Sequence, residues 1–108
     1  MPFRSFPEFL FPVTALQASP TTIDVTFNAP VVPGPLDAGN WSAKTGPATF
    51  PTAASSAEAL GPPDAGVVRI TLAGFGAFTL VSYNPPPFDV TAVGSGVASA
   101  AFTDFPVM

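Results

Sequence analysis

The chain has 108 residues, of which 47% are hydrophobic and only 9% are charged, and its formal net charge is −4. This length fits one domain with a single core, and a charged fraction far below the roughly 25% of an average soluble domain suits a surface that neighbouring subunits cover. The three basic residues are scattered, which argues against nucleic acid or an anionic membrane as a partner. The chain has no cysteine, which excludes disulfides and thiolate metal sites. It has no histidine either, so the usual Ser-His-Asp and Cys-His catalysis is also excluded.

The chain opens with MPFRSFPEFLFP, a segment rich in phenylalanine and proline. The prolines exclude a helix, and Pro7 and Glu8 interrupt the apolar run that a secretory signal needs. We therefore predict an extended arm at residues 1–12 and one domain at 13–108. A complete product with this start would stay in the cytoplasm, where it is made. The sequence contains no run of about 18 apolar residues, so we expect no transmembrane helix. The arm residues predicted to bind a partner are Phe3, Phe6, Phe9 and Phe11; the alternative is that these rings cover an edge of the chain's own sheet.

Beyond the arm, alternation of apolar and polar residues predicts about seven short strands. The clearest alternation is TTIDVTF at residues 21–27, followed by VVRITLA at 67–73. Turn clusters rich in glycine and proline separate the strands, as in an all-β sandwich or barrel. The expected strands, in chain order, are 13–18, 21–27, 40–44, 47–53, 67–73, 78–83 and 96–103.

Two segments between these strands have local signals of their own. AASSAEAL at residues 53–60 is the only stretch with enough helix formers for one or two helical turns. AGFGAF at residues 73–78 contains G-x-G but lacks the third glycine and the helix of a dinucleotide loop, so we interpret it as a hairpin turn.

The order of these elements resembles a known family. Residues 18–107 resemble the bacterial and phage immunoglobulin-like domains of surface and virion proteins. The segments that carry the resemblance are, in order, SPTTIDVTFNAPV, VVRITLAG, TLVSYN and VASAAFTDFPV. The resemblance implies an immunoglobulin-like β-sandwich of about seven short strands, used in adhesion or assembly. The resemblance implies no catalytic residues.

The remaining groups that could carry chemistry are seven carboxylates. A pair of them could serve a glycosidase only in a cleft that a small sandwich rarely builds. Calcium is the stronger alternative because it prefers several oxygen ligands together, but no dense D-x-D-x-D-G run is present, and we interpret the loop acids as turn caps. The candidate ligands are Asp37, Asn40, Asp64 and Asp89. We expect no catalytic residue, no cofactor and no metal.

The two polar aromatic residues are interpreted as structural. Trp41 lies in a formal NWS glycosylation sequon but is expected to anchor the core. Tyr83 is expected to be a core ring with a satisfied hydroxyl, or a residue similar to a tyrosine corner.

These features together predict a non-enzymatic structural assembly protein. The expected setting is a phage virion assembled in the host cytoplasm, where the chain serves as a capsid decoration or tail-associated protein. Its partners would be other protein subunits, itself among them, in a homo-oligomer or larger assembly. The alternative is an adhesion or carbohydrate-binding module of a larger surface protein, which would need an exposed aromatic platform.

Overall fold

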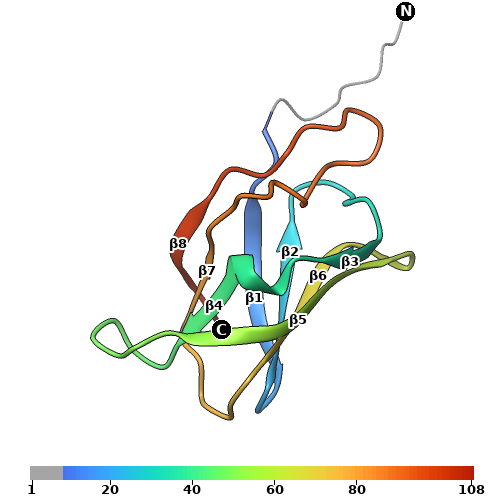
Figure 1. Ribbon diagram of the computed structural model, residues 1–108. Helices are drawn as coiled ribbons and strands as arrows, with labels where there is room; N and C mark the ends of the chain where they lie inside the picture. Colours follow the sequence, from blue (N-terminus) through green and yellow to red (C-terminus); the bar gives the residue numbers. More distant parts are fainter. Residues whose placement is uncertain (1–8) are drawn as a thin grey trace, which may run out of the picture.

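The computed structural model describes residues 9–108, which are built almost entirely of β-strands (Figure 1). This confirms the predicted all-β class. The one helix among the described residues is the short 3-10 helix η1 (Ala38–Asn40). The strands are β1 (Pro12–Ser19), β2 (Thr22–Phe27), β3 (Gly34–Leu36), β4 (Trp41–Lys44), β5 (Thr52–Gly61), β6 (Asp64–Leu72), β7 (Leu80–Tyr83) and β8 (Phe102–Pro106).

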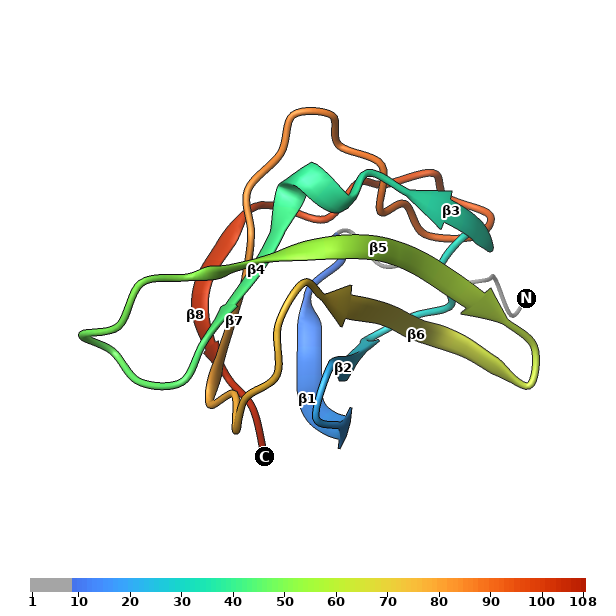
Figure 2. The ribbon, with the colours of Figure 1, turned by 60° about the horizontal axis from the view of Figure 1, so that its bottom comes forward.

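The strands form one antiparallel sheet in the order β1-β2-β6-β5-β4-β7-β8, with β3 paired to β5 beside this path. The long strand β5 joins the two halves, because its first residues pair with β4 and its later residues pair with β6. The sheet curls until it is nearly a barrel, and β1 and β8 are its two ends (Figure 2). Because seven strands alternate in direction along the path, these two end strands run parallel to each other.

The strands with clean alternation appear where the sequence predicts them. In β2, Ile23 and Val25 are fully buried, while the intervening Asp24 faces outward beside Arg69 of β6. Successive side chains of a strand point to opposite faces, so a period of two is a direct signal of a sheet with one covered face. The buried residues of β6, which are Val68, Ile70 and Leu72, obey the same rule.

The one stretch with enough helix formers for helical turns, residues 53–60, is part of β5. Strand pairing decides the structure of this segment rather than local helix propensity. Residues 57–59 lie between β6 on one side and β3 on the other, and the small side chains of Ala57 and Ala59 are 4% and 2% exposed against the core.

Two expectations are corrected. Residues 73–78 do not form a hairpin turn, because they lie in the connection from β6 to β7, and β7 pairs with β4 and β8 instead of β6. The last strand was expected at residues 96–103 but begins at Phe102. The glycines at 94 and 96 have φ values of 90° and 72°, which only glycine adopts easily, and they hold the preceding segment in a turn.

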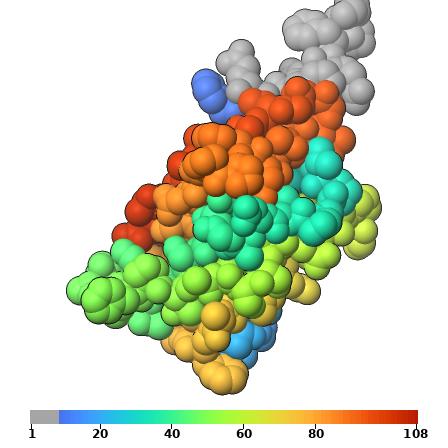
Figure 3. Space-filling view, in the orientation of Figure 1, coloured from blue at the N-terminus to red at the C-terminus, as the bar shows by residue number. Residues whose placement is uncertain are grey.

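The long connection between β7 and β8 covers one end of the barrel (Figure 3). It is tied to the segment before β3, since Val31 pairs with Ala92 and Val93 N–H donates to the Pro30 carbonyl at 2.9 Å. Val90 and Ala92 of this connection are buried. The connection is therefore part of the core, although it holds little regular structure.

An aromatic cluster fills the middle of the core. The rings of Trp41 and Tyr83 lie 4.8 Å apart, and the ring of Phe102 lies 5.9 and 5.7 Å from them. Trp41 is 1% exposed and Tyr83 is fully buried, which confirms that both are core residues.

Candidate interaction site

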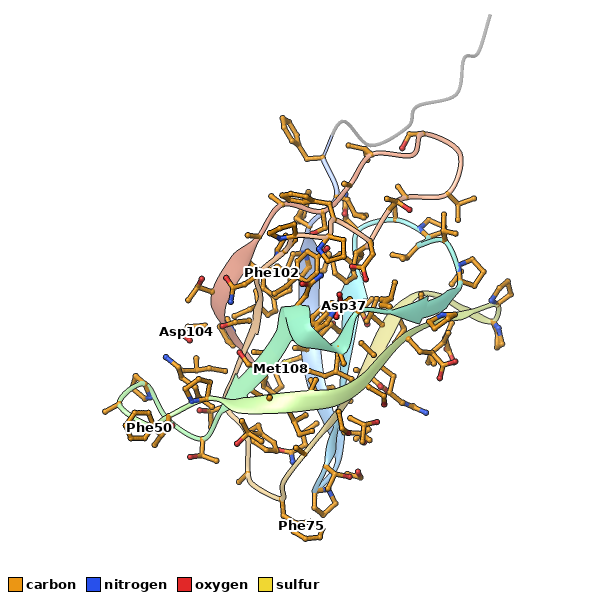
Figure 4. The ribbon with its side chains drawn as sticks, in the orientation of Figure 1. Asp37, Phe50, Phe75, Phe102, Asp104 and Met108 are labelled. Carbon is orange, nitrogen blue, oxygen red and sulfur yellow. The ribbon has the colours of Figure 1, made fainter. Side chains whose placement is uncertain are left out.

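Large apolar side chains are exposed over much of the described surface. Phe50, on the loop between β4 and β5, is 95% exposed, and Phe75, on the loop between β6 and β7, is 84% exposed. Figure 4 shows both rings on these loops, at the edge of the molecule and away from the core. The exposed large apolar residues are Phe9, Phe11, Val13, Leu16, Val32, Phe50, Phe75, Phe88, Val93 and Met108.

Two of the four phenylalanines predicted to bind a partner lie within the described residues. Phe9 is 72% and Phe11 is 51% exposed, whereas Leu10 between them is 2% exposed and belongs to the core. Phe3 and Phe6 lie outside the described residues. The core therefore reaches back to Leu10, two residues before the expected boundary of the arm.

The amide of Asn28 holds this part of the chain. Its Nδ2 donates to the Phe9 carbonyl at 3.0 Å, and its Oδ1 accepts from Phe11 N–H at 2.8 Å. Leu10 is in turn paired with Ser99. Side chains alternate along an extended chain. The two hydrogen bonds from Asn28 therefore hold Leu10 facing the core and the rings of Phe9 and Phe11 facing outward.

The sheet is left open along a seam between β1 and β8. The two strands form no ladder, although the chain crosses the seam at two points. At one end, Leu10 pairs with Ser99. At the other, Met108 N–H donates to the Ala15 carbonyl at 2.8 Å and Gln17 N–H donates to the Met108 carbonyl at 3.4 Å. Between these points the barrel is not closed.

A proline explains why the seam stays open. In the parallel register set by Met108 and Ala15, the next bond would run from residue 106 to the Val13 carbonyl. Residue 106 is Pro106, which has no N–H to donate. On the other strand, the β1–β2 register shifts between Pro12 and Thr14, which leaves Val13 without a partner on β2.

The open seam forms an apolar groove of about 210 Å³. Val13 and Met108 at its rim are 53% and 72% exposed, while Ala15 at its base is fully buried. The lining residues are Val13, Thr14, Ala15, Phe105, Pro106 and Met108. This groove was not predicted from the sequence, since the last strand was expected to end at residue 103, before the proline that keeps the seam open.

The candidate calcium ligands come together only in part. The Asp89 carboxylate accepts hydrogen bonds from Asp37 N–H, from the Tyr83 hydroxyl at 3.2 Å and from Asn40 Nδ2 at 3.5 Å. Asp37 itself caps η1, since its Oδ1 accepts from the N–H of residue 39 at 2.8 Å. Asp64 lies apart, at the start of β6.

This arrangement fits the interpretation of the loop acids as turn caps, because the contacts named for Asp37 and Asp89 come from N–H and O–H donors of the protein itself. Within residues 9–108, no group of three or more acidic, histidine or cysteine side chains is placed to hold a metal ion.

Tyr83 is the only tyrosine in the chain. Burial, reinforced by the nearby charge of Asp89, raises the pKa of the Tyr83 phenol to about 12, against about 10 for an unperturbed tyrosine. Below pH 10 the phenol is neutral in both the folded and the unfolded chain. Between pH 10 and 12 the unfolded chain ionises first, so stability is lost as the pH rises through this window.

We therefore predict that the free energy of unfolding falls from pH 10 upward and that Tyr83→Phe removes most of this fall. Phenolate absorbance of the wild-type chain reports this single residue and should rise near pH 12 or together with unfolding. Ionisation near pH 10 with the fold intact, followed by circular dichroism, would contradict the prediction.

Comparisons of the chain with protein-family models, with curated proteins and with solved structures give no match. Among residues 9–108, no helix has the length and apolar character needed to span a membrane. The functional argument therefore depends on the geometry of the surface itself.

Proposed function

We propose that the chain is a non-enzymatic structural assembly protein that binds neighbouring subunits through its apolar surface and its N-terminal segment. The observation that carries this proposal is the exposure of large apolar side chains, led by Phe50 and Phe75. Large exposed apolar patches mark interaction surfaces, and interface cores are rich in aromatic residues and poor in charge. The low charged fraction of the sequence supports the same conclusion.

We also propose that the curled sheet is an immunoglobulin-like sandwich. The strand order supports this, because β1-β2-β6-β5 on one side and β4-β7-β8 on the other follow the A-B-E-D and C-F-G order of that fold. The proposed setting is a phage virion, with the chain as a capsid decoration or tail-associated protein assembled in the host cytoplasm. The support for this setting is the sequence resemblance to virion domains.

The alternative of a carbohydrate-binding module is weakened by the aromatic residues. A sugar platform built on tryptophan or tyrosine would need them exposed, but Trp41 and Tyr83, the only Trp and Tyr of the chain, are both buried. Both basic residues of the described chain are also paired internally: Lys44 lies 3.3 Å from Asp104, and Arg69 lies 2.7 Å from Asp24. Among residues 9–108, no basic side chain is therefore free to pair with a partner, and we expect binding to depend mainly on apolar contact.

The proposal predicts self-association that depends on the N-terminal rings. The double variant Phe3→Ser/Phe6→Ser should raise the dissociation constant of the assembly at least tenfold. Each buried phenylalanine contributes roughly 1.5–3 kcal/mol by area, part of which is lost in ordering the segment, and about 1.4 kcal/mol is a factor of ten. Sedimentation velocity over a range of concentrations measures the change, with Ser5→Ala as the control.

A wild-type chain that stays monomeric throughout this range would contradict self-assembly. Point variants test the segment more cleanly than deletion of residues 1–12, because that deletion also removes Leu10, which is part of the core.

A further inference from the structure

We propose that the groove between β1 and β8 is the acceptor site for the N-terminal segment of a second copy of this chain, with the ring of Phe3 or Phe6 seated in it. This inference rests on the proposed function and names the surface that the segment would bind. It assigns one occupant, residues 1–8 of a neighbouring copy.

The chemistry and size of the groove suit a phenylalanine ring. All of its lining residues are apolar except Thr14. A cavity of about 150 Å³ with a similar lining is enough to bind benzene in another protein, so the groove of about 210 Å³ has room for one phenyl ring. A ring placed there would cover the exposed faces of Val13 and Met108, which solvent now reaches.

The walls of the groove also offer backbone groups. The Ala15 carbonyl faces β8 and is already taken by Met108 N–H. By the alternation of a strand the Val13 carbonyl faces the same side, opposite Pro106, and Val13 has no partner on β2 either. An extended peptide binds such an open strand edge through its own backbone groups. Residues 3–6 of the N-terminal segment contain no proline, so each retains the N–H that this pairing requires.

The length of the segment favours a second copy over the same chain. Leu10 is fixed opposite Ser99, and Val13 lies four residues beyond Phe9, about 13 Å away at roughly 3.3 Å per residue. At most about 10 Å of chain joins Phe6 to Phe9, and a reversal of direction takes about four residues. Phe6 of the same chain therefore falls short of the groove. Phe3, at most about 20 Å of chain from Phe9, reaches it only if the turn uses no more than about two residues.

Each copy would thus carry one donor segment and one acceptor groove. Because these are different surfaces, the contact is head-to-tail, and such contacts close into rings or continue as filaments. This arrangement can be tested by damaging the donor and the acceptor on separate full-length chains.

The first experiment uses Val13→Asp as the acceptor variant and Phe3→Ser/Phe6→Ser as the donor variant. The short carboxylate of aspartate cannot extend out of the groove as lysine would, so docking should weaken at least tenfold. Val32→Asp is the matched control, since Val32 is 46% and Val13 is 53% exposed. We expect each damaged chain alone to be monomeric and their mixture to form one-to-one dimers, because one intact donor and one intact acceptor remain.

Dimers in the mixture show that the acceptor domain of the donor variant is folded, and circular dichroism of Val13→Asp checks its own domain, so loss of association cannot be attributed to unfolding. If Val13→Asp associates as the wild type does while the donor variant does not, the segment docks elsewhere and the groove assignment is overturned, with the proposed function intact. If both variants associate as the wild type does, both proposals fail. Two monomeric variants whose mixture stays monomeric would also overturn the assignment.

The second experiment identifies the occupant directly. The chain has no cysteine, so with Phe6→Cys and Val13→Cys on separate full-length chains the only mixed disulfide is the intended one. Each variant oxidised alone measures the background of homodimers, which the mixture must exceed. We expect a disulfide-linked dimer on a non-reducing gel from this mixture and little from Phe6→Cys mixed with Val32→Cys. A double variant that gives an internally bridged monomer would show that the segment folds back on its own chain, which overturns the proposal of a second copy.

Discussion

Replacement of Trp41 by alanine is expected to lower the free energy of unfolding by about 3–5 kcal/mol, the range for removing a large buried aromatic side chain. Trp41 is 1% exposed and packs against Tyr83 and Phe102, with ring centroids 4.8 and 5.9 Å away. Its removal leaves a cavity that rigid neighbouring strands cannot fill. Because single domains are stable by only about 5–15 kcal/mol, the variant should lie near the limit of folding.

Trp41→Phe is the matched variant. It keeps a ring in the cluster and removes the indole Nε1–H, which is buried without a hydrogen-bond partner among the described residues. An unpaired buried donor is itself costly, so the loss should be clearly smaller than for alanine. Urea unfolding followed by circular dichroism measures both variants. Equal losses for the two would show that the ring packing at Trp41 does not carry the stability assigned to it.

The features that the sequence predicts well are those set by local alternation. In β2, every second residue from Ile23 onward is apolar and buried, so the pattern determines both the strand and its inward face. The burial of Trp41 is equally predictable, because a large apolar ring within a strand of a small single domain is usually buried in its core. These are properties of a few neighbouring residues, and they need no knowledge of the rest of the fold.

The features that the sequence does not predict depend on distant partners. Residues 53–60 have the composition of a helix, and only pairing to β6 and β3 makes them a strand. The groove depends on the meeting of β1 with β8, some 90 residues later, and on the absence of one N–H at Pro106. A proline near the end of a strand is visible in the sequence, but its consequence appears only when the facing edge is known.

The burial of Leu10 leads to the second large expected effect. Leu10→Ala should lower the free energy of unfolding by about 2–5 kcal/mol, as for other buried leucines. Leu10 is 2% exposed and pairs with Ser99, so it anchors the first described residues to the connection between β7 and β8. Phe9→Ala removes a larger side chain that is 72% exposed, and it should change the stability by no more than about 0.5 kcal/mol.

The comparison of these neighbours separates folding from assembly. Leu10→Ala should shift the midpoint of urea unfolding strongly at any protein concentration, because the lost contacts lie within one chain. Phe9→Ala should leave that midpoint unchanged at concentrations where the chain is monomeric. A Leu10→Ala variant as stable as the wild type would place this residue outside the core, and would make deletion of the whole segment 1–12 a fair test of assembly after all.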